Sequence, residues 1–227
     1  MKHVVFLSGA GMSAESGIST FRDSGGLWEQ YDVMEVASIE GWRKNPDLMQ
    51  RFYNDRRAQL DKVEPNHGHR LIAELEKDFK VTVITQNVDN LHERAGSSDV
   101  VHLHGELTKV CNESKTEVID IGTKPVDVGA KASDGSRLRP FIVWFGEAVP
   151  LIEHAAQVVS KADVVVIIGT SMQVYPAASL INYARNSAEV FLIDPNSVEA
   201  HLPRVEIIKE KASVGMEILS QKLNKLK

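Results

Sequence analysis

Two histidines and the only cysteine of the chain lie close together in the stretch VHLHGELTKVCNES, residues 101–114. Histidine and cysteine side chains are common zinc ligands. A histidine can also transfer protons by itself, because its ordinary pKa of about 6.5 lies near neutral pH. The stretch therefore has two interpretations: a metal site, or a catalytic histidine beside an unrelated cysteine.

A second candidate for chemistry is the glycine-rich stretch GAGMSAESG, residues 9–17, which follows the first apolar run. Gly9 and Gly11 match the turn in which backbone N–H groups approach a pyrophosphate. An ordinary dinucleotide site also needs an acid at the end of a second strand, about 20 residues further on. Glu29 and Asp32 lie at about that distance, but no apolar strand leads to them. A dinucleotide, if bound, is expected to be held differently than in a hydride-transferring dehydrogenase.

Short continuous apolar runs, typical of buried parallel strands, alternate along the chain with helical patterns. The runs predict strands at 3–8, 81–87, 100–105, 163–171, 189–195 and 205–210. The helical patterns lie at 67–79, 150–161 and 176–187, with a last amphipathic stretch at 213–226. This alternation predicts an α/β fold with a Rossmann-like, doubly wound parallel sheet.

Two segments interrupt the alternation, and we expect them to form a smaller inserted module within a single domain spanning 1–227. One contains a helical pattern at 45–60, and the other is a polar stretch. The expected division places about 1–29, 66–108 and 140–227 in the Rossmann-like part, and about 30–65 and 109–139 in the small module.

Composition excludes several classes of protein. The net charge is −5, which argues against a nucleic-acid-binding surface. No stretch approaches the roughly 18 apolar residues that a membrane-spanning helix needs, and a single cysteine fits a reducing compartment. We therefore expect a cytoplasmic protein without nucleic-acid or membrane partners, whose oligomeric state the sequence does not predict.

Five blocks of the sequence together resemble the sirtuin family. They are GAGMSAESGISTFR (9–22), TQNVDNLHERAG (85–96), HLHGE (102–106), LRPFIVWFGE (138–147) and GTSMQVYPAA (169–178), in the family's order and over most of the chain. The resemblance implies an NAD-dependent protein-lysine deacylase whose partners are acyl-lysine proteins or peptides. NAD would be a co-substrate, and the products would be free lysine, nicotinamide and an O-acyl-ADP-ribose.

The resemblance also implies roles for individual residues. His104 would help deprotonate a ribose hydroxyl, Asn87 would orient the ribose, and Asp89 would hold the nicotinamide carboxamide. His102 is expected to be structural and to lie on the strand face opposite to His104. The other residues implied to line the cofactor are Gly9, Ala10, Gly11, Ser13, Thr20, Phe21, Arg22, Gln86, Gly169, Thr170, Ser171 and Asp194. Asp194 stands where the family usually has asparagine.

A further set of residues is implied to bind the substrate peptide. The segment with Val143, Phe145, Gly146 and Glu147 would pair with the peptide backbone as an added strand. Val174 and Tyr175 would lie on the other side of that peptide.

The acyl group is indicated by the stretch FYNDRR within the helical pattern at 45–60. Tyr53 and Arg56 are three residues apart and so share a helix face. They match the Tyr-x-x-Arg pair of the sirtuin class that removes succinyl and malonyl groups, and Ala37 matches the small residue that widens its pocket. A carboxylate in an apolar channel needs such a guanidinium and hydroxyl. Otherwise the pair is a packing residue and a solvated charge, with Arg57 the less favoured partner.

The cysteine departs from the family, in which most members hold a structural zinc with two Cys-x-x-Cys pairs. Cys111 matches the first position, but Ser114 stands in place of its partner and KASDGS at 131–136 contains no cysteine. One thiolate cannot hold zinc, so we expect no metal site. The small module is expected to fold around apolar residues of its own, namely Val118, Ile119, Ile121, Val126 and Val128.

Two other functions stay open at this stage. One is a related transferase that passes ADP-ribose from NAD to a protein side chain. The other is a non-enzymatic module that only binds NAD or ADP-ribose. Complete blocks around Asn87, Asp89 and His104 beside a Tyr-Arg pair favour deacylation over both.

Overall fold

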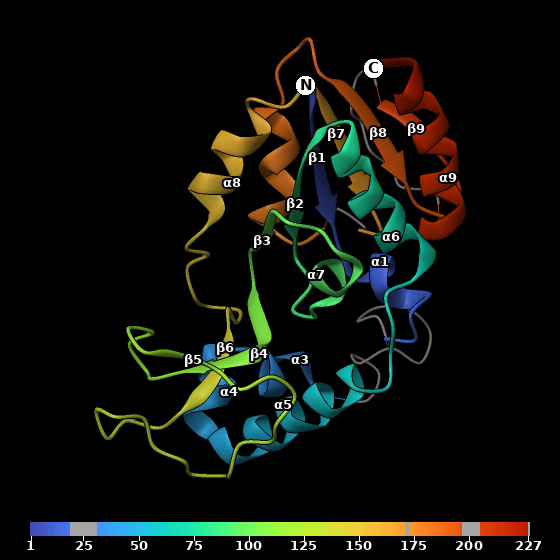
Figure 1. Ribbon diagram of the computed structural model, residues 1–227. Coiled ribbons are helices and arrows are strands. Elements are labelled where there is room, and N and C mark those ends of the chain that lie inside the picture. Colours follow the sequence, from blue (N-terminus) through green and yellow to red (C-terminus); the bar gives the residue numbers. More distant parts are fainter. Residues whose placement is uncertain (19–30, 171–172, 197–204, 227) are drawn as a thin grey trace.

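The computed structural model describes residues 1–18, 31–170, 173–196 and 205–226. Four of the predicted cofactor residues, Thr20, Phe21, Arg22 and Ser171, lie outside these ranges. Figure 1 shows two parts: a larger lobe built on a parallel sheet and a smaller lobe below it that contains a second sheet and helices.

The larger lobe contains a six-stranded sheet in the order β3-β2-β1-β7-β8-β9, and every neighbouring pair is parallel. Its strands are β1 (His3–Ser8), β2 (Lys80–Thr85), β3 (Val100–His102), β7 (Val164–Ile168), β8 (Glu189–Ile193) and β9 (Val205–Ile208). The predicted α/β class with a doubly wound parallel sheet is confirmed. All six strands lie within or at the edge of the predicted apolar runs, because such runs can be buried on both faces.

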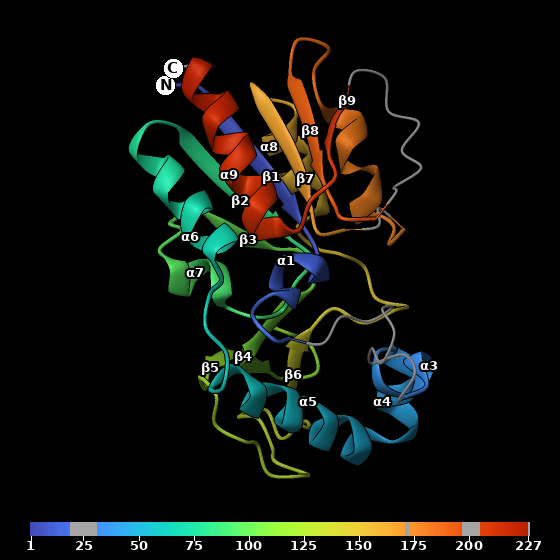
Figure 2. The same ribbon diagram turned by 90° about the vertical axis from the view of Figure 1, so that its right-hand side faces the viewer.

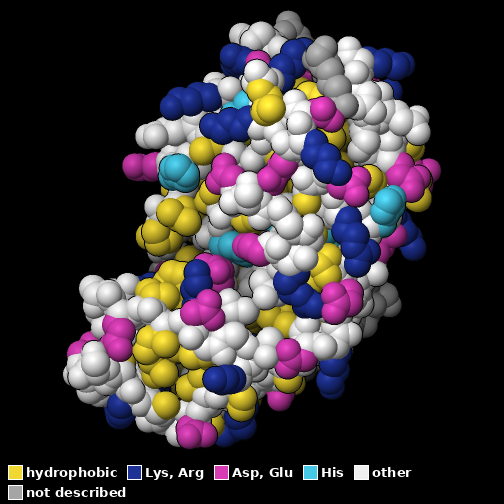
Figure 3. Space-filling model, viewed as in Figure 1, with side chains coloured by type: hydrophobic (Ala, Val, Ile, Leu, Met, Phe, Trp, Pro, Cys, Tyr) yellow, Lys and Arg dark blue, Asp and Glu magenta, His cyan; other side chains and the backbone are white. Residues whose placement is uncertain are grey.

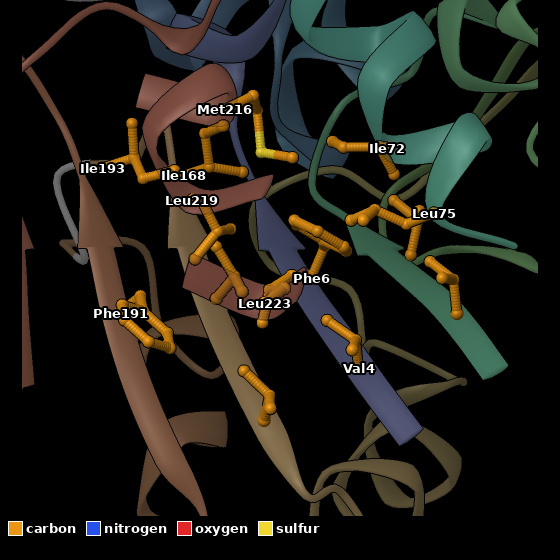
Figure 4. Packing of buried hydrophobic residues seen from close by; sticks show 14 of the residues in the cluster. Val4, Phe6, Ile72, Leu75, Ile168, Phe191, Ile193, Met216, Leu219 and Leu223 are labelled. Atoms are coloured by element: carbon orange, nitrogen blue, oxygen red, sulfur yellow. The ribbon is translucent and has the colours of Figure 1, made fainter. Parts of the chain in front are cut away.

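Helices cover both faces of this sheet (Figure 2). On one face, α6 (His67–Glu74) and α9 (Ala212–Leu223) pack over Val4 and Phe6 of β1, as Figure 4 shows from close by. On the other face, α8 (Ile152–Val159) and the 3₁₀ helix η2 (Ala177–Tyr183) pack over Val5 and Leu7. Successive residues of a strand point to opposite faces, so β1 contributes to both cores. Each such buried side chain stabilises the fold by about 1.5–3 kcal/mol.

Shorter helical elements complete the larger lobe. These are α1 (Ala10–Ala14), α7 (Leu91–Ala95), η1 (Leu75–Lys77) and η3 (Asn224–Leu226). None of the described helices is long and apolar enough to cross a bilayer. On the face shown in Figure 3, positive and negative side chains are interspersed rather than gathered by sign.

Among the described residues, the smaller lobe pairs an antiparallel sheet with three helices. The sheet has the order β5-β4-β6, from β4 (Gly105–Cys111), β5 (Val118–Asp120) and β6 (Arg139–Ile142). The helices are α3 (Val33–Val36), α4 (Ile39–Lys44) and α5 (Pro46–Leu60). α5 begins as its sequence predicts, because the Asn45 side chain accepts a hydrogen bond from Leu48 N–H and Pro46 occupies the first turn.

The core of the smaller lobe differs from the expected one. Val118, Ile119 and Val128 are exposed and Ile121 is half-buried, so of the five expected residues only Val126 is buried. β5 is an edge strand with all three residues exposed, so it offers no covered face. The core instead comes from the helices and β4–β6, through Val36, Trp42, Met49, Phe52, Tyr53, Leu60, Leu107, Ile142 and Trp144.

Two buried histidines, one on α6 and one on α7, pack against each other. The rings of His69 and His92 meet edge to face with centroids 4.8 Å apart, and both side chains are almost fully buried. His69 Nδ1 accepts a hydrogen bond from Asn66 N–H at 3.3 Å, while Nε2 has no partner among the described residues. Burial, helped by the charge of Arg70, lowers the pKa of His69 to about 4.

This burial predicts acid sensitivity. The unfolded chain binds a proton at His69 below an ordinary pKa of about 6.5, while the folded chain stays neutral until about pH 4. Stability from this group is therefore complete above pH 6.5 and is lost as the pH falls. We expect the free energy of unfolding to drop by about 2 kcal/mol between pH 7 and pH 5 through His69 alone.

Urea denaturation at several pH values checks this expectation. The free energy of unfolding of His69→Asn should depend less steeply on pH than that of the wild type. His154→Gln, at an exposed position on α8, should keep the wild-type slope. An unchanged slope in His69→Asn would contradict it.

Candidate active site

The site lies at the carboxyl ends of the parallel strands, where the strand order reverses. β1 is followed along the chain by β2 on one side, while β7, β8 and β9 extend on the other side. Ligands of open α/β sheets bind at such a switch point. The predicted residues Gly9 and Gly169 directly follow β1 and β7, so they lie at this point.

The two glycine turns pack against each other there. Gly11 N–H donates to Gly169 C=O at 2.8 Å, and Gly9 N–H donates to Ile168 C=O at 3.1 Å. A Cβ on Gly169 would lie 2.2 Å from Met12 N, and its φ of +61° disfavours other residues. The junction itself therefore requires glycine, independently of any phosphate that the turn binds. Ala10 begins α1 beside it.

A buried polar cluster joins α1 to the loop after β2. Ser13 Oγ donates to Asp89 Oδ2 at 2.9 Å and accepts from Asn87 Nδ2 at 3.1 Å. The other Asp89 oxygen accepts from Leu91 N–H at 3.1 Å. Burial raises the pKa of Asp89, while these hydrogen bonds and the charge of Arg56 oppose the rise. The structure thus brings together three predicted residues that are up to 76 positions apart.

His104 lies beside this cluster with one defined tautomer. Its Nδ1 is 3.1 Å from Gln86 C=O, and a carbonyl can only accept, so Nδ1 carries the proton. Nε2 of the neutral ring is then unprotonated, and none of the described residues donates a hydrogen bond to it. Burial lowers the pKa of His104 and the Gln86 carbonyl partly offsets this effect, so the ring is neutral near pH 7.

His102 makes different contacts. Its Nδ1 lies 2.9 Å from Asn87 C=O and its Nε2 lies 2.6 Å from Glu93 Oε1. Burial alone would lower the pKa of His102, but the Glu93 carboxylate outweighs it and raises the pKa. β3 ends at His102, so His104 lies beyond the strand. In a continuous strand the two residues would share a face, because side chains alternate with a period of two, so the expected opposite faces do not follow from alternation. Glu93 thus holds His102 in place. Glu93 lies within the TQNVDNLHERAG block, but the sequence did not indicate this role for it.

The remaining described cofactor candidates also follow strand ends. Gln86 comes directly after β2, and its Nε2 donates to Thr170 Oγ1 at 3.2 Å. Asp194 follows β8, is buried, and accepts a hydrogen bond from Asn196 N–H at 2.8 Å. Together with Gly9 after β1, the described cofactor candidates therefore come from loops after four parallel strands.

The predicted peptide-binding segment connects the two lobes. Val143 N–H donates to His104 C=O at 2.9 Å, and Phe145 N–H donates to Ala37 C=O at 2.9 Å. Phe145 C=O in turn accepts from Ile39 N–H at 3.0 Å. Gly146 continues the segment with a φ of +87°. The segment thus lies between His104 and the predicted pocket residue Ala37.

Exposure differs among the predicted peptide contacts. The Phe145 side chain is 45% exposed and Tyr175 is 75% exposed, while Val174 is half-buried. Glu147 is different, because its carboxylate accepts two hydrogen bonds of 2.9 Å from Arg139 and one from the backbone N–H of Trp144. That carboxylate is engaged within the chain.

Tyr53 and Arg56 are both buried on the inner face of α5. Burial raises the pKa of Tyr53 to about 12, and the charge of Arg56 opposes the rise. Burial lowers the pKa of Arg56, against the charges of Tyr53 and Asp89. Arg56 therefore lies within electrostatic range of both the phenol and the buried cluster.

Arg57 points elsewhere. Its Nε donates to Leu107 C=O at 2.6 Å and its Nη1 donates to Asn54 at 2.7 Å, so it braces α5 against β4. The two neighbouring arginines thus make different contacts.

The place where the resemblance expects zinc does not fit the ion. Cys111 is buried in β4, and burial raises the pKa of its thiol to about 11. The neighbouring Asn112 amide donates to Asp134 at 2.8 Å and to Thr116 at 3.0 Å, while its oxygen accepts from Thr116 N–H at 2.9 Å. Ser114 is exposed. Within the described ranges, no group of three potential metal-binding side chains is found.

Comparisons with known proteins agree with the fold and with the sequence blocks. Residues 9–176 match the Sir2 family. An NAD-dependent protein deacylase of Bacteroides thetaiotaomicron is 59% identical over 230 residues, which cover 98% of each chain. A solved Sir2 homologue mutant in complex with ADP-ribose has a TM-score of 0.91 at 37% identity, covering 99% of this chain and 93% of that one.

A Sir2 homologue in complex with NAD has a TM-score of 0.89 at 37% identity, covering 99% of this chain and 90% of the other. The glycine turn, the QNVDN loop, His104 and the segment from Val143 to Glu147 all fall within the matched residues. The resemblance of the five blocks to sirtuins is thus confirmed, and this chain belongs to the Sir2 family.

Proposed function

We propose that this chain, an NAD-dependent protein deacylase of the Sir2 family, removes succinyl and malonyl groups from protein lysine side chains, and acetyl groups more weakly. The observation that carries the acyl preference is the burial of Tyr53 and Arg56 together, with Arg56 within electrostatic range of Asp89. Free lysine, nicotinamide and O-acyl-ADP-ribose would be the products.

The acyl preference follows from the chemistry of a buried carboxylate. A carboxylate that leaves water is stable only when charged and polar donors replace its hydration. A guanidinium and a phenol, both buried on one face of α5, supply such donors. Ala37 would leave room for the longer acyl chain, and an acetyl group would fit the same space without using the donors.

His104 is proposed as the general base. NAD supplies an activated ribose carbon and a ribose hydroxyl when it is bound. The free Nε2 of the neutral His104 ring suits removal of a proton from that hydroxyl. Because the folded pKa of His104 is lowered, we expect activity to persist at mildly acidic pH and to fall only as the ring becomes protonated.

The buried cluster is proposed to hold the co-substrate. Asp89 accepts one hydrogen bond at each oxygen, and a carboxylate has about four acceptor positions, so it can also accept from a carboxamide. Asn87 would orient the ribose, with Gln86 near its hydroxyls. The proposed cofactor set also includes Gly9, Ala10, Gly11, Ser13, Thr20, Phe21, Arg22, Gly169, Thr170, Ser171 and Asp194.

The peptide is proposed to lie along the connecting segment, between Val143–Glu147 and Val174–Tyr175. Exposed Phe145 and Tyr175 give such a surface apolar contacts. The cytoplasm is the proposed compartment, because a reducing environment suits the buried free thiol of Cys111.

One experiment tests the reaction directly. A single peptide is prepared in succinyl-lysine and acetyl-lysine forms and incubated with the protein, with and without NAD, and mass spectrometry follows the acyl groups. We expect NAD-dependent loss of both groups, with succinyl lost faster. His104→Ala should reduce both rates by at least about 100-fold, as expected for a general base, and should still bind NAD. Label from NAD appearing on the peptide would instead favour the ADP-ribosyl transferase.

The acyl pocket has its own test. Arg56→Met keeps the length of the side chain but removes a charged donor, so we expect kcat/KM for the succinyl peptide to fall by about 30–100-fold. The acetyl peptide should change by less than about threefold. Arg51→Met, an exposed arginine on the same helix, is the matched control and should leave both rates unchanged. An equal loss of kcat/KM on both peptides would indicate that Arg56 has only a structural role.

We further propose that the smaller lobe folds without zinc. A thiol with a pKa of about 11 is protonated near neutral pH and binds metal poorly, and the Asn112 hydrogen bonds hold together the stretch after β4. Protein prepared without added metal should contain far less than one zinc per chain by elemental mass spectrometry, and a chelator should not change its melting temperature. Zinc near one equivalent would overturn this proposal.

A further inference from the structure

We propose that Trp144 is a positioning residue for acyl selectivity: its indole N–H holds the Tyr53 oxygen so that the phenol proton is presented to the carboxylate of an acidic acyl group. This inference rests on the proposed function, because it concerns the same pocket. Trp144 lies within the connecting segment, and the sequence motifs did not indicate a role for it.

The hydrogen bond between Trp144 and Tyr53 has only one possible direction. Trp144 Nε1 lies 2.9 Å from Tyr53 Oη, and both side chains are buried. An indole N–H can only donate, so the Tyr53 oxygen is the acceptor. The phenol proton must then point in another direction, and no described residue accepts it. With a pKa raised to about 12 by burial, the phenol keeps this proton at neutral pH.

The surroundings hold the indole in one orientation. The Arg139 guanidinium stacks 3.7 Å from the centroid of the Trp144 ring, and the Trp42 ring lies 5.2 Å away by centroid distance. Arg139 is itself fixed by its two hydrogen bonds to Glu147. The same carboxylate also accepts a hydrogen bond from the backbone N–H of Trp144 at 2.9 Å. Both the backbone and the ring of Trp144 are thus restrained, so the bond to Tyr53 has little freedom to turn.

The proton that remains suits a carboxylate. Arg56 lies within electrostatic range of the phenol, which makes the surroundings of that proton electropositive. A carboxylate could therefore accept one hydrogen bond from Tyr53 and others from Arg56. An acetyl group has no such oxygen, so the orientation of Tyr53 should matter only for acidic acyl groups. This difference separates a positioning role for Trp144 from a role in packing alone.

The test is a double-mutant cycle on the full-length protein. The kcat/KM values for succinyl and acetyl forms of one peptide are measured at saturating NAD for the wild type, Trp144→Phe, Tyr53→Phe and the double variant. We expect Trp144→Phe to lower the succinyl value by about tenfold, the scale of one hydrogen bond. The acetyl value should change by less than about threefold. In the Tyr53→Phe background, Trp144→Phe should have no further effect on the succinyl-to-acetyl ratio.

Two further variants keep the result interpretable. Trp42→Phe is the matched control, because it keeps an aromatic ring packed on Trp144 and Arg139 and removes only the N–H that donates to Glu113, so its ratio should equal the wild-type ratio. Trp144→benzothienylalanine, which replaces only the N–H by sulfur, repeats the test if Trp144→Phe is unstable.

The outcomes distinguish this inference from the proposed function. Equal losses on both peptides, or the same loss in the Tyr53→Phe background, would overturn the role of Trp144 while leaving the acyl preference intact. A wild type without any succinyl preference, or a Tyr53→Phe ratio equal to the wild-type ratio, would instead overturn the acidic-acyl pocket and this inference with it.

Discussion

The contact between the two glycine turns, at Gly11 and Gly169, is the constraint on which the site depends. Because the turns touch through backbone atoms, the ends of β1 and β7 meet without any side chain between them. α1 then starts at the centre of the sheet edge and carries Ser13 to the loop after β2. The hydrogen bonds from Ser13 to Asp89 and Asn87 follow from that placement. A larger residue at either turn would displace the whole cluster.

The second constraint is the connecting segment between the lobes. Its backbone bonds to His104 on one side and to Ala37 on the other, so the proposed base and the proposed acyl pocket are held by the same five residues. Trp144 is the second residue of this segment, and its indole N–H donates to Tyr53. A movement of the smaller lobe would therefore change the pocket and the base together. This coupling would keep the proposed acyl pocket and the proposed base in a fixed relative position.

Burial sets the charge state of each group in the site. Without charged partners, burial keeps His104 neutral, while the Glu93 carboxylate reverses the effect for His102, two residues earlier. The same principle holds Cys111 as a thiol and the Tyr53 phenol in its protonated form. Neighbouring residues thus reach different protonation states through their partners rather than through their own chemistry.

The sequence alone determined the parallel sheet, because continuous apolar runs can be buried only between two helical layers. It also indicated the family, since short motifs depend on local order. It did not determine the core of the smaller lobe, the end of β3, or the pairing of Tyr53 with Trp144. That pairing joins residues 91 positions apart. Such contacts depend on how the lobes pack, which only the tertiary structure decides, because no local pattern encodes the distance between remote side chains.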